Sequence, residues 1–199
     1  MTSLKKQNIK IVMKYTWPIY IVSAVLVAFL LSFIFGIVHK LPDYKTLTLF
    51  ISGEVIDSKK LEKDLLEKYQ DKELQSVTTI SALPSDSSYD TKLTVAGFTS
   101  ADILILPLSE LSNRKPSTFG LDLTEEIIAS YYQDKTIYKE EDMGYGIKIN
   151  KDAVKEYMAL QQEDYYMILN ANSENIGQYS KTQIKEHDLA LQLVKEWGI

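Results

Sequence analysis

The chain has 199 residues, enough for one domain plus a further segment, and the charged residues make up 25%, which excludes a generic disordered polymer. It contains no cysteine, which excludes disulfides, thiolate catalysis and a lipid-modified cysteine anchor. Residues 1–40 hold five lysines and no acidic residue, whereas residues 41–199 hold the other 17 basic and all 27 acidic residues, a balance of 17 − 27 = −10. Because binding to a phosphate backbone needs a basic face, this balance argues against a nucleic-acid partner.

Residues 17–38, WPIYIVSAVLVAFLLSFIFGIV, form an uncharged apolar run. At about 1.5 Å per residue a helix of this run spans roughly 33 Å, enough to cross the core of a lipid bilayer. Four lysines precede it, which predicts a short cytoplasmic tail at 1–16 and a domain outside the cell membrane. The run is too long for a signal peptide and lacks a small-x-small cleavage site, so we predict an uncleaved single-pass anchor.

A short tether at 39–45 leads into a region that alternates between strand and helix patterns. Residues 46–51 (TLTLFI) and 102–106 (DILIL) are apolar runs typical of buried strands, and residues 76–80 (SVTTI) predict a third strand between them. The intervening patterns are helical. Helices are expected after a cap at Asp57 or Ser58, over 89–96, and from Thr124.

The last third of the chain contains two further strand patterns and a long amphipathic pattern. Tyr145–Asn150 and Tyr165–Leu169 predict strands, and Asn150 is placed to cap a helix over KDAVKEYMAL. The spacing of apolar residues predicts a helix from about Thr182 to Trp197, with Ile184 in its apolar stripe.

These patterns predict an α/β fold for residues 46–199. Two of the first three strands are apolar throughout, which indicates parallel strands covered on both faces. We therefore expect a single three-layer α/β/α sandwich lobe with a mostly parallel sheet, preceded by one transmembrane helix, with 102–106 at its centre. Ligands of such sheets meet the loops at the carboxyl ends of the strands, which here are Ser52–Glu54 and Pro107–Glu110.

The sequence shows no catalytic or cofactor signature. His39 and His187 are the only histidines and lie far apart, which argues against a metal site. No nucleophile elbow and no glycine-rich phosphate loop is present. Acidic pairs and a tyrosine-rich stretch over 131–179 are explained as well by solvated charge and packing as by ligand contacts. A non-enzymatic protein without a cofactor is predicted, with a membrane-tethered hydrolase as the less favoured class.

The order of the segments resembles one protein family. The runs YDTKLTVAGFTSADILIL, FGLDLTEEI and YGIKIN are similar to the first lobe of bacterial extracellular solute-binding proteins, which have the type II periplasmic-binding-protein fold. Residues 121–124 stand at the family's LxDLT position, and Tyr145, Gly146 and Asn150 at its YGxPxN position. The resemblance covers about residues 46–150. Lys148 stands where the family often has proline, and the lipid-anchoring cysteine is absent.

The resemblance implies a binding module that has lost one of the family's two lobes, because residues 41–199 are too few for two. A small solute or a peptide is the implied ligand. The alternative is a ligand-free interaction subunit that docks onto a membrane complex such as an ABC permease. Asp102 has a second interpretation, in which it orients a loop. The residues expected to gather at one sheet edge and bind the ligand or partner are Ser52, Gly53, Glu54, Thr99, Asp102, Ser109, Glu110 and Tyr145.

Overall fold

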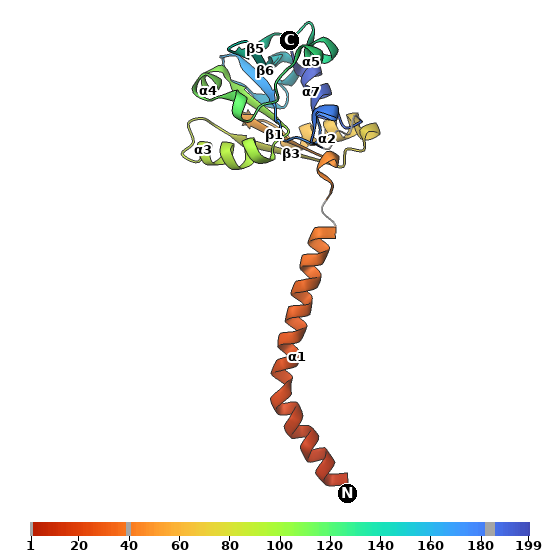
Figure 1. The fold of residues 1–199 in the computed structure, drawn as a ribbon. Helices are drawn as coiled ribbons and strands as arrows, with labels where there is room; N and C mark the ends of the chain where they lie inside the picture. The colour runs from red at the N-terminus through yellow and green to blue at the C-terminus, as the bar shows by residue number, and fades with distance from the viewer. Residues whose placement is uncertain (1, 39–40, 182–185) are drawn as a thin grey trace. The chain divides into compact units, whose positions relative to one another are not determined.

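The computed structural model describes residues 2–38, 41–181 and 186–199, with the backbone alone described for 2–16 and 36–38. The chain divides into two compact units, Met1–Leu41 and Pro42–Ile199, which are described separately (Figure 1). The second unit begins at Pro42 and not at the predicted Thr46. Asp43–Lys45, assigned to the tether by sequence, form a 3-10 turn (η1) that belongs to this unit.

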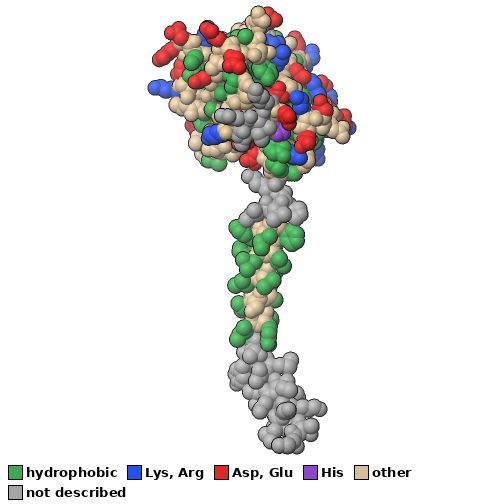
Figure 2. Space-filling model, turned by 45° about the vertical axis from the view of Figure 1, so that its right-hand side comes forward, with side chains coloured by type: hydrophobic (Ala, Val, Ile, Leu, Met, Phe, Trp, Pro, Cys, Tyr) green, Lys and Arg blue, Asp and Glu red, His purple; other side chains and the backbone are tan. Residues whose placement is uncertain are grey.

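The first unit is one continuous helix, α1, over Thr2–Val38. The predicted basic tail is therefore the first part of the same helix. Its segment Trp17–Phe35 is long and apolar enough to cross a membrane. The side chains of this segment are exposed, and Figure 2 shows hydrophobic groups along it. An exposed apolar helix of this length is stable where hydrocarbon replaces water around it.

The second unit is a mixed α/β domain built on a six-stranded sheet of order β3-β1-β4-β8-β6-β5. As the sequence predicted, β1 pairs in parallel with β3 and β4, and β4 lies inside the sheet. The other three pairings are antiparallel, so the sheet is mixed. Strand β8 runs opposite to both of its neighbours, β4 and β6, and the consecutive strands β5 and β6 form an antiparallel pair. The strands are β1 Thr46–Ser52, β3 Ser76–Ala82, β4 Ile103–Pro107, β5 Ile137–Glu140, β6 Met143–Lys148 and β8 Tyr165–Leu169.

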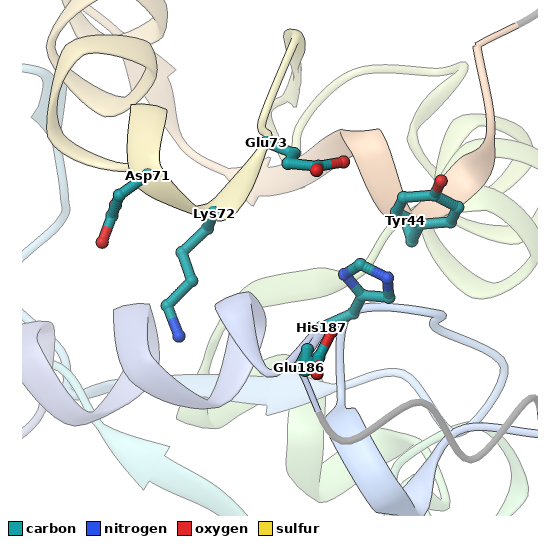
Figure 3. Close-up of a pocket in the computed structure, with 6 residues that line it drawn as sticks. All are labelled: Tyr44, Asp71, Lys72, Glu73, Glu186 and His187. Atoms are coloured by element: carbon teal, nitrogen blue, oxygen red, sulfur yellow. The ribbon is translucent and has the colours of Figure 1, made fainter.

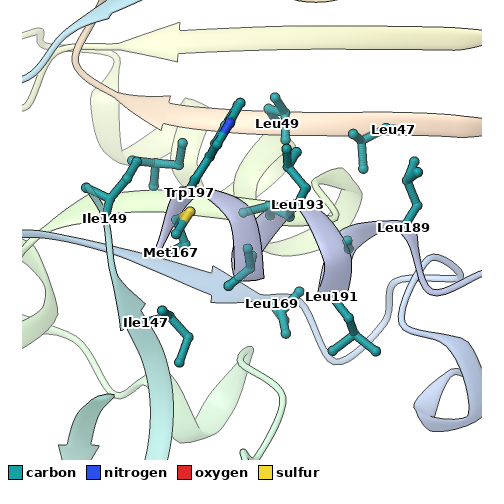
Figure 4. Close-up of a cluster of buried hydrophobic side chains, with 14 of the residues drawn as sticks. Leu47, Leu49, Ile147, Ile149, Met167, Leu169, Leu189, Leu191, Leu193 and Trp197 are labelled. Carbon is teal, nitrogen blue, oxygen red and sulfur yellow. The ribbon is translucent and has the colours of Figure 1, made fainter. Parts of the chain in front are cut away.

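Side chains that alternate along the strands enter two separate hydrophobic clusters, one on each face of the sheet. Leu49 and Ile105 enter the larger cluster, whereas Phe50 and Leu104 enter the smaller one. Figure 4 shows helix α7 (Leu189–Trp197) laying Leu193 and its neighbours into the larger cluster. Both clusters consist only of residues from the second unit, so this unit has the core it needs to fold alone.

Helices contribute further residues to each cluster. Helices α2, α5, α6 and α7 contribute to the larger cluster, and α3, the π-helical turn η3 and α4 contribute to the smaller one. The helix bounds are α2 Ser58–Lys68, α3 Tyr89–Lys92, η3 Leu93–Phe98, α4 Leu108–Asn113, α5 Glu125–Ile127, η5 Ile128–Tyr132 and α6 Lys151–Val154. The remaining short elements are η2 Gln70–Lys72, η4 Pro116–Thr118, η6 Gly177–Tyr179, β2 Glu54–Val55 and β7 Met158–Ala159.

The helix starts predicted from capping residues are confirmed. Asp57 accepts a hydrogen bond from the Lys60 amide at 2.9 Å, and the Thr124 and Asn150 side chains accept equivalent bonds. The helix after Asn150 is much shorter than predicted, because its expected end pairs as β7 with β2. The predicted first turn of the C-terminal helix, including Ile184, lies outside the described residues, and α7 begins at Leu189.

Two glycines differ in whether their backbone conformation favours glycine. Gly177 has a φ of 58°, whereas Gly53, in the loop after β1, does not have positive φ. A methyl group on Gly53 would lie at 3.4 Å from the Ala159 carbonyl oxygen, which is ordinary contact. We expect Gly177→Ala to lower the free energy of unfolding by about 1–2 kcal/mol. Gly53→Ala should change it by less than about 1 kcal/mol. Urea denaturation of residues 42–199 measures both, and equal losses would contradict this assignment.

Candidate functional site

The chain leaves β1 and β4 toward opposite faces of the sheet. After β1 it enters α2, whose Leu61 and Leu65 belong to the larger cluster. After β4 it enters α4, whose Leu111 belongs to the smaller cluster. Two adjacent parallel strands with diverging connections leave a crevice at their carboxyl ends, where α/β proteins bind ligands. In this chain the topology places that position beside Ser52 and Pro107, the ends of β1 and β4.

A polar cluster is built at this position on the side of α3. The buried Ser52 hydroxyl is 2.8 Å from the Tyr89 hydroxyl, and burial raises the pKa of Tyr89 to about 12. The Arg114 guanidinium lies over the Tyr89 ring, 5.8 Å from its centroid. It is held there by the carboxylates of Asp90, at 2.6 Å, and Glu110, at 2.9 Å. We call Ser52, Tyr89, Asp90, Glu110 and Arg114 the crevice cluster.

The other residues predicted for the carboxyl edge also lie near it. Gly53 packs against Ala159 and Leu160, and Glu54 is exposed in β2. The Ser109 amide donates a hydrogen bond to the Glu163 carboxylate at 3.0 Å. The Ser109 amide, at the start of α4, is therefore already hydrogen-bonded to Glu163 and is not available to a ligand.

Three predicted residues do not join this edge. Thr99 and Asp102 precede β4, so they lie at its amino end. Ser109 follows β4 and lies at its carboxyl end. Ile168 of β8 pairs with Leu104 on one side and with Gly146 on the other. Tyr145, the residue before Gly146, therefore lies near the amino end of β4. The prediction of one common edge is wrong for Thr99, Asp102 and Tyr145. Thr99 and Asp102 are close to Ser109 in the sequence, but β4, which is about 17 Å long, lies between them.

Asp102 is the centre of a buried hydrogen-bond network at the amino ends of β1 and β4. Its carboxylate accepts bonds from the Thr48 amide at 2.7 Å, the Ser173 hydroxyl at 2.5 Å and the Asn175 side-chain amide at 3.2 Å. Asn175 also donates to the Thr46 carbonyl at 2.8 Å. Asp102 thus fastens the loop after β8 to the first strand. This geometry agrees with the loop-orienting interpretation of Asp102. No local pattern in the sequence pointed to Ser173 or Asn175.

The ionisation of Asp102 gives a pH prediction. Burial raises the pKa of its carboxyl, and the bonds from Ser173, Thr48 and Asn175 offset only part of this effect. The folded state therefore binds a proton more readily than the unfolded state. Stability from this group then falls as pH rises from the ordinary aspartate pKa, about 3.9, through the raised folded pKa.

Acidification through that window should stabilise the native protein relative to Asp102→Asn, whose amide does not titrate. Urea denaturation of both proteins at a series of pH values measures the difference in their free energies of unfolding. The same pH dependence in both proteins would show that Asp102 does not titrate in this way.

A polar cavity of about 510 Å³ lies where the start of the domain meets the segment before α7 (Figure 3). The Tyr44 and His187 rings stack across it with centroids 4.1 Å apart. Lys45 and Glu73 form an ion pair of 2.8 Å beside it. His187 lies before α7 and outside any helix. The stack was not predictable, because Tyr44 and His187 come from opposite ends of the domain's sequence.

Tyr145 lines another cavity, of about 380 Å³, with Lys115, Ser117, Met143 and the acidic residues 140–142 at the end of β5 and in the turn after it. Burial raises the pKa of the Tyr145 hydroxyl, with Asp122 adding to the effect. Within residues 2–38, 41–181 and 186–199, no group of three or more potential ligand side chains is arranged to hold a metal ion. Comparisons with models of protein families, with curated proteins and with solved structures found no match for this chain.

Proposed function

We propose that the protein is a membrane-anchored, extracytoplasmic binding module that resembles one three-layer α/β/α lobe of a solute-binding protein of ABC transporters. The observation that carries the proposal is the crevice cluster at the diverging carboxyl ends of β1 and β4. The Tyr89 ring is buried beneath the Arg114 guanidinium, so it is Arg114 that offers hydrogen-bonding groups there. The α1 helix and the lysines before it support an anchor with a cytoplasmic amino end.

The chemistry of the crevice supports binding rather than catalysis. The Tyr89 hydroxyl has a pKa of about 12 and its bonded partner is the Ser52 hydroxyl, which is not a base at neutral pH. General acid–base catalysis requires a group that titrates near the working pH. A non-enzymatic role is therefore the better proposal for the crevice cluster.

The charges at the crevice favour a neutral or cationic ligand. Arg114 is already neutralised by Asp90 and Glu110, and Glu163 occupies the Ser109 amide. An anionic ligand would have to displace these carboxylates. A neutral sugar, or a neutral or basic peptide, meets no such opposition, because an acidic rim attracts positive charge and tolerates hydroxyl groups.

A thermal-shift screen of residues 42–199 against oligosaccharides, neutral and basic peptides, and acidic peptides tests the proposal. A ligand at ten times its Kd should stabilise the domain by about 1.4 kcal/mol. Arg114→Ala should abolish the rise in Tm, whereas Lys115→Ala, at the neighbouring exposed position, should preserve it. A stable domain that responds to no compound, or a response that survives Arg114→Ala, would overturn the proposal.

One observation favours the alternative of an interaction subunit. Ile56, just after β2, is 59% exposed and Leu108, the first residue of α4, is 37% exposed. Leu108 directly follows β4, and Ile56 comes four residues after the end of β1. Both are therefore close in sequence to the edge where the missing second lobe of a solute-binding protein would close. Burial of these two side chains against a membrane protein such as an ABC permease would stabilise that contact.

Mild detergent extraction from the native membrane followed by mass spectrometry tests this alternative. A transport permease should co-purify with the native chain and be lost from the Ile56→Lys/Leu108→Lys variant. A chain that purifies without a permease would exclude it.

A further inference from the structure

The two outer strands of the sheet differ in how they are protected. Strand β5 has four residues, carries Lys139 and Glu140, and its register shifts between Tyr138 and Lys139. Strand β3 has seven residues, SVTTISA, and its register with β1 is continuous from end to end. Charges, short length and bulges prevent an edge strand from pairing with other chains. Edge β5 has all three protections, and edge β3 has none of them.

The outer side of β3 is free to pair. A parallel neighbour such as β1 uses the backbone groups on one side of β3 and leaves those on the other side facing outward. Over the described parts of the chain, no loop or side chain hydrogen-bonds to the backbone of residues 76–82. The Thr79 hydroxyl, at the middle of the strand, is buried and has no partner among the described residues. Thr78 and Ser81 are exposed.

The charge of the domain indicates what can pair there. With a net charge of 17 − 27 = −10 over residues 41–199, two copies repel each other across most of their surfaces. Strand β3 is an uncharged stretch of seven residues at an edge, so two copies can approach there without opposing like charges. An anchor that holds copies in one membrane also raises their local concentration.

We propose that β3 pairs with β3 of a second copy of this chain, antiparallel and with the two-fold axis at Thr79. In this register Thr78 faces Ile80 of the second copy, and Val77 faces Ser81. The two Thr79 side chains lie opposite each other, where threonine pairs form favourable cross-strand contacts. Directly opposite residues of an antiparallel pair point to the same face of the sheet. The sheet face that carries each hydrophobic cluster therefore continues across the dimer.

The cysteine-free chain allows a direct test with single cysteines. In the proposed register the Thr79 Cα atoms are about 4.5–5.5 Å apart, within the range that a disulfide spans. The Thr78 Cα atoms are offset by two residues and lie about 8 Å apart, beyond that range. Mild oxidation of membranes that contain the full-length chain should therefore cross-link Thr79→Cys. The controls Thr78→Cys and Lys139→Cys, on the same strand and on edge β5, should stay uncrosslinked.

Light scattering of the full-length chain in detergent supplies a second measurement without a covalent link. The protein part of the native particle should have twice the chain mass of 22.7 kDa. Thr78→Lys and Ser81→Lys each place a charge at an exposed edge position and should reduce the mass to that of one chain. Circular dichroism confirms that each variant is folded. A native chain of single mass, or cross-linking of Thr79→Cys no greater than that of both controls, would overturn the proposal.

Discussion

Replacing Asp102 with alanine is expected to lower the free energy of unfolding of the domain by about 3–5 kcal/mol. The substitution leaves three donors without their acceptor, on Thr48, Ser173 and Asn175. A buried donor that loses its partner costs about 1–3 kcal/mol, because water cannot replace the bond. The loop after β8 would also lose its link to β1, so the amino ends of two central strands would be weakened together.

Urea denaturation of residues 42–199 measures this loss. Asp102→Asn retains one acceptor and should cost less than the alanine substitution. Asp90→Ala is the matched control, because it removes an aspartate that is 81% exposed and paired with Arg114. Exposed ion pairs contribute about 0–1 kcal/mol, so a loss from Asp90→Ala as large as that from Asp102→Ala would contradict the argument.

Replacing Trp197 with alanine is expected to cost about 3–5 kcal/mol. Trp197 is 6% exposed and packs in the larger cluster, where Figure 4 shows it beside Leu49 and Leu193. Its removal takes away a large apolar surface and leaves a cavity that the surrounding strands cannot fill without moving. A loss of this size is a large part of the stability of a small domain.

Lys195→Ala is the control on the same helix, because Lys195 is exposed and its ammonium lies over the Tyr131 ring at 6.0 Å. Its removal should change the free energy of unfolding by no more than about 1 kcal/mol. Thermal and urea denaturation of both variants test this contrast. Equal effects would mean that α7 is not fastened to the sheet through Trp197.

Local patterns were sufficient for most elements of the domain. The apolar runs at Thr46–Ser52 and Ile103–Pro107 are strands, and Asp57 and Thr124 cap the helices that follow them. These predictions succeed because strand periodicity and capping depend on residues that are close in the sequence. The helix predicted after Asn150 fails beyond Val154, because pairing with β2 takes precedence over its local propensity.

The same reasoning predicted only part of the candidate site. Ser52 and Glu110 follow apolar strands, so their place at the carboxyl edge follows from the direction of the chain. Arg114 and Tyr89 gave no local signal, because their roles depend on helices α3 and α4 meeting beside β1. Asp102 and Tyr145 carried a signal but were assigned to the wrong end of the sheet.

The sequence by itself determined the apolar helix, the acidic charge of the domain and the alternation of strands and helices. These properties follow from composition and from periodicity over a few residues. Only the tertiary structure decided that β8 lies antiparallel between β4 and β6, that Asp102 binds the loop with Asn175, and that β3 is an open edge. The physical reason is that these strand pairings and buried hydrogen bonds join residues from 18 (Lys148 and Tyr166) to 73 (Asp102 and Asn175) positions apart, and no local pattern encodes which distant partners meet.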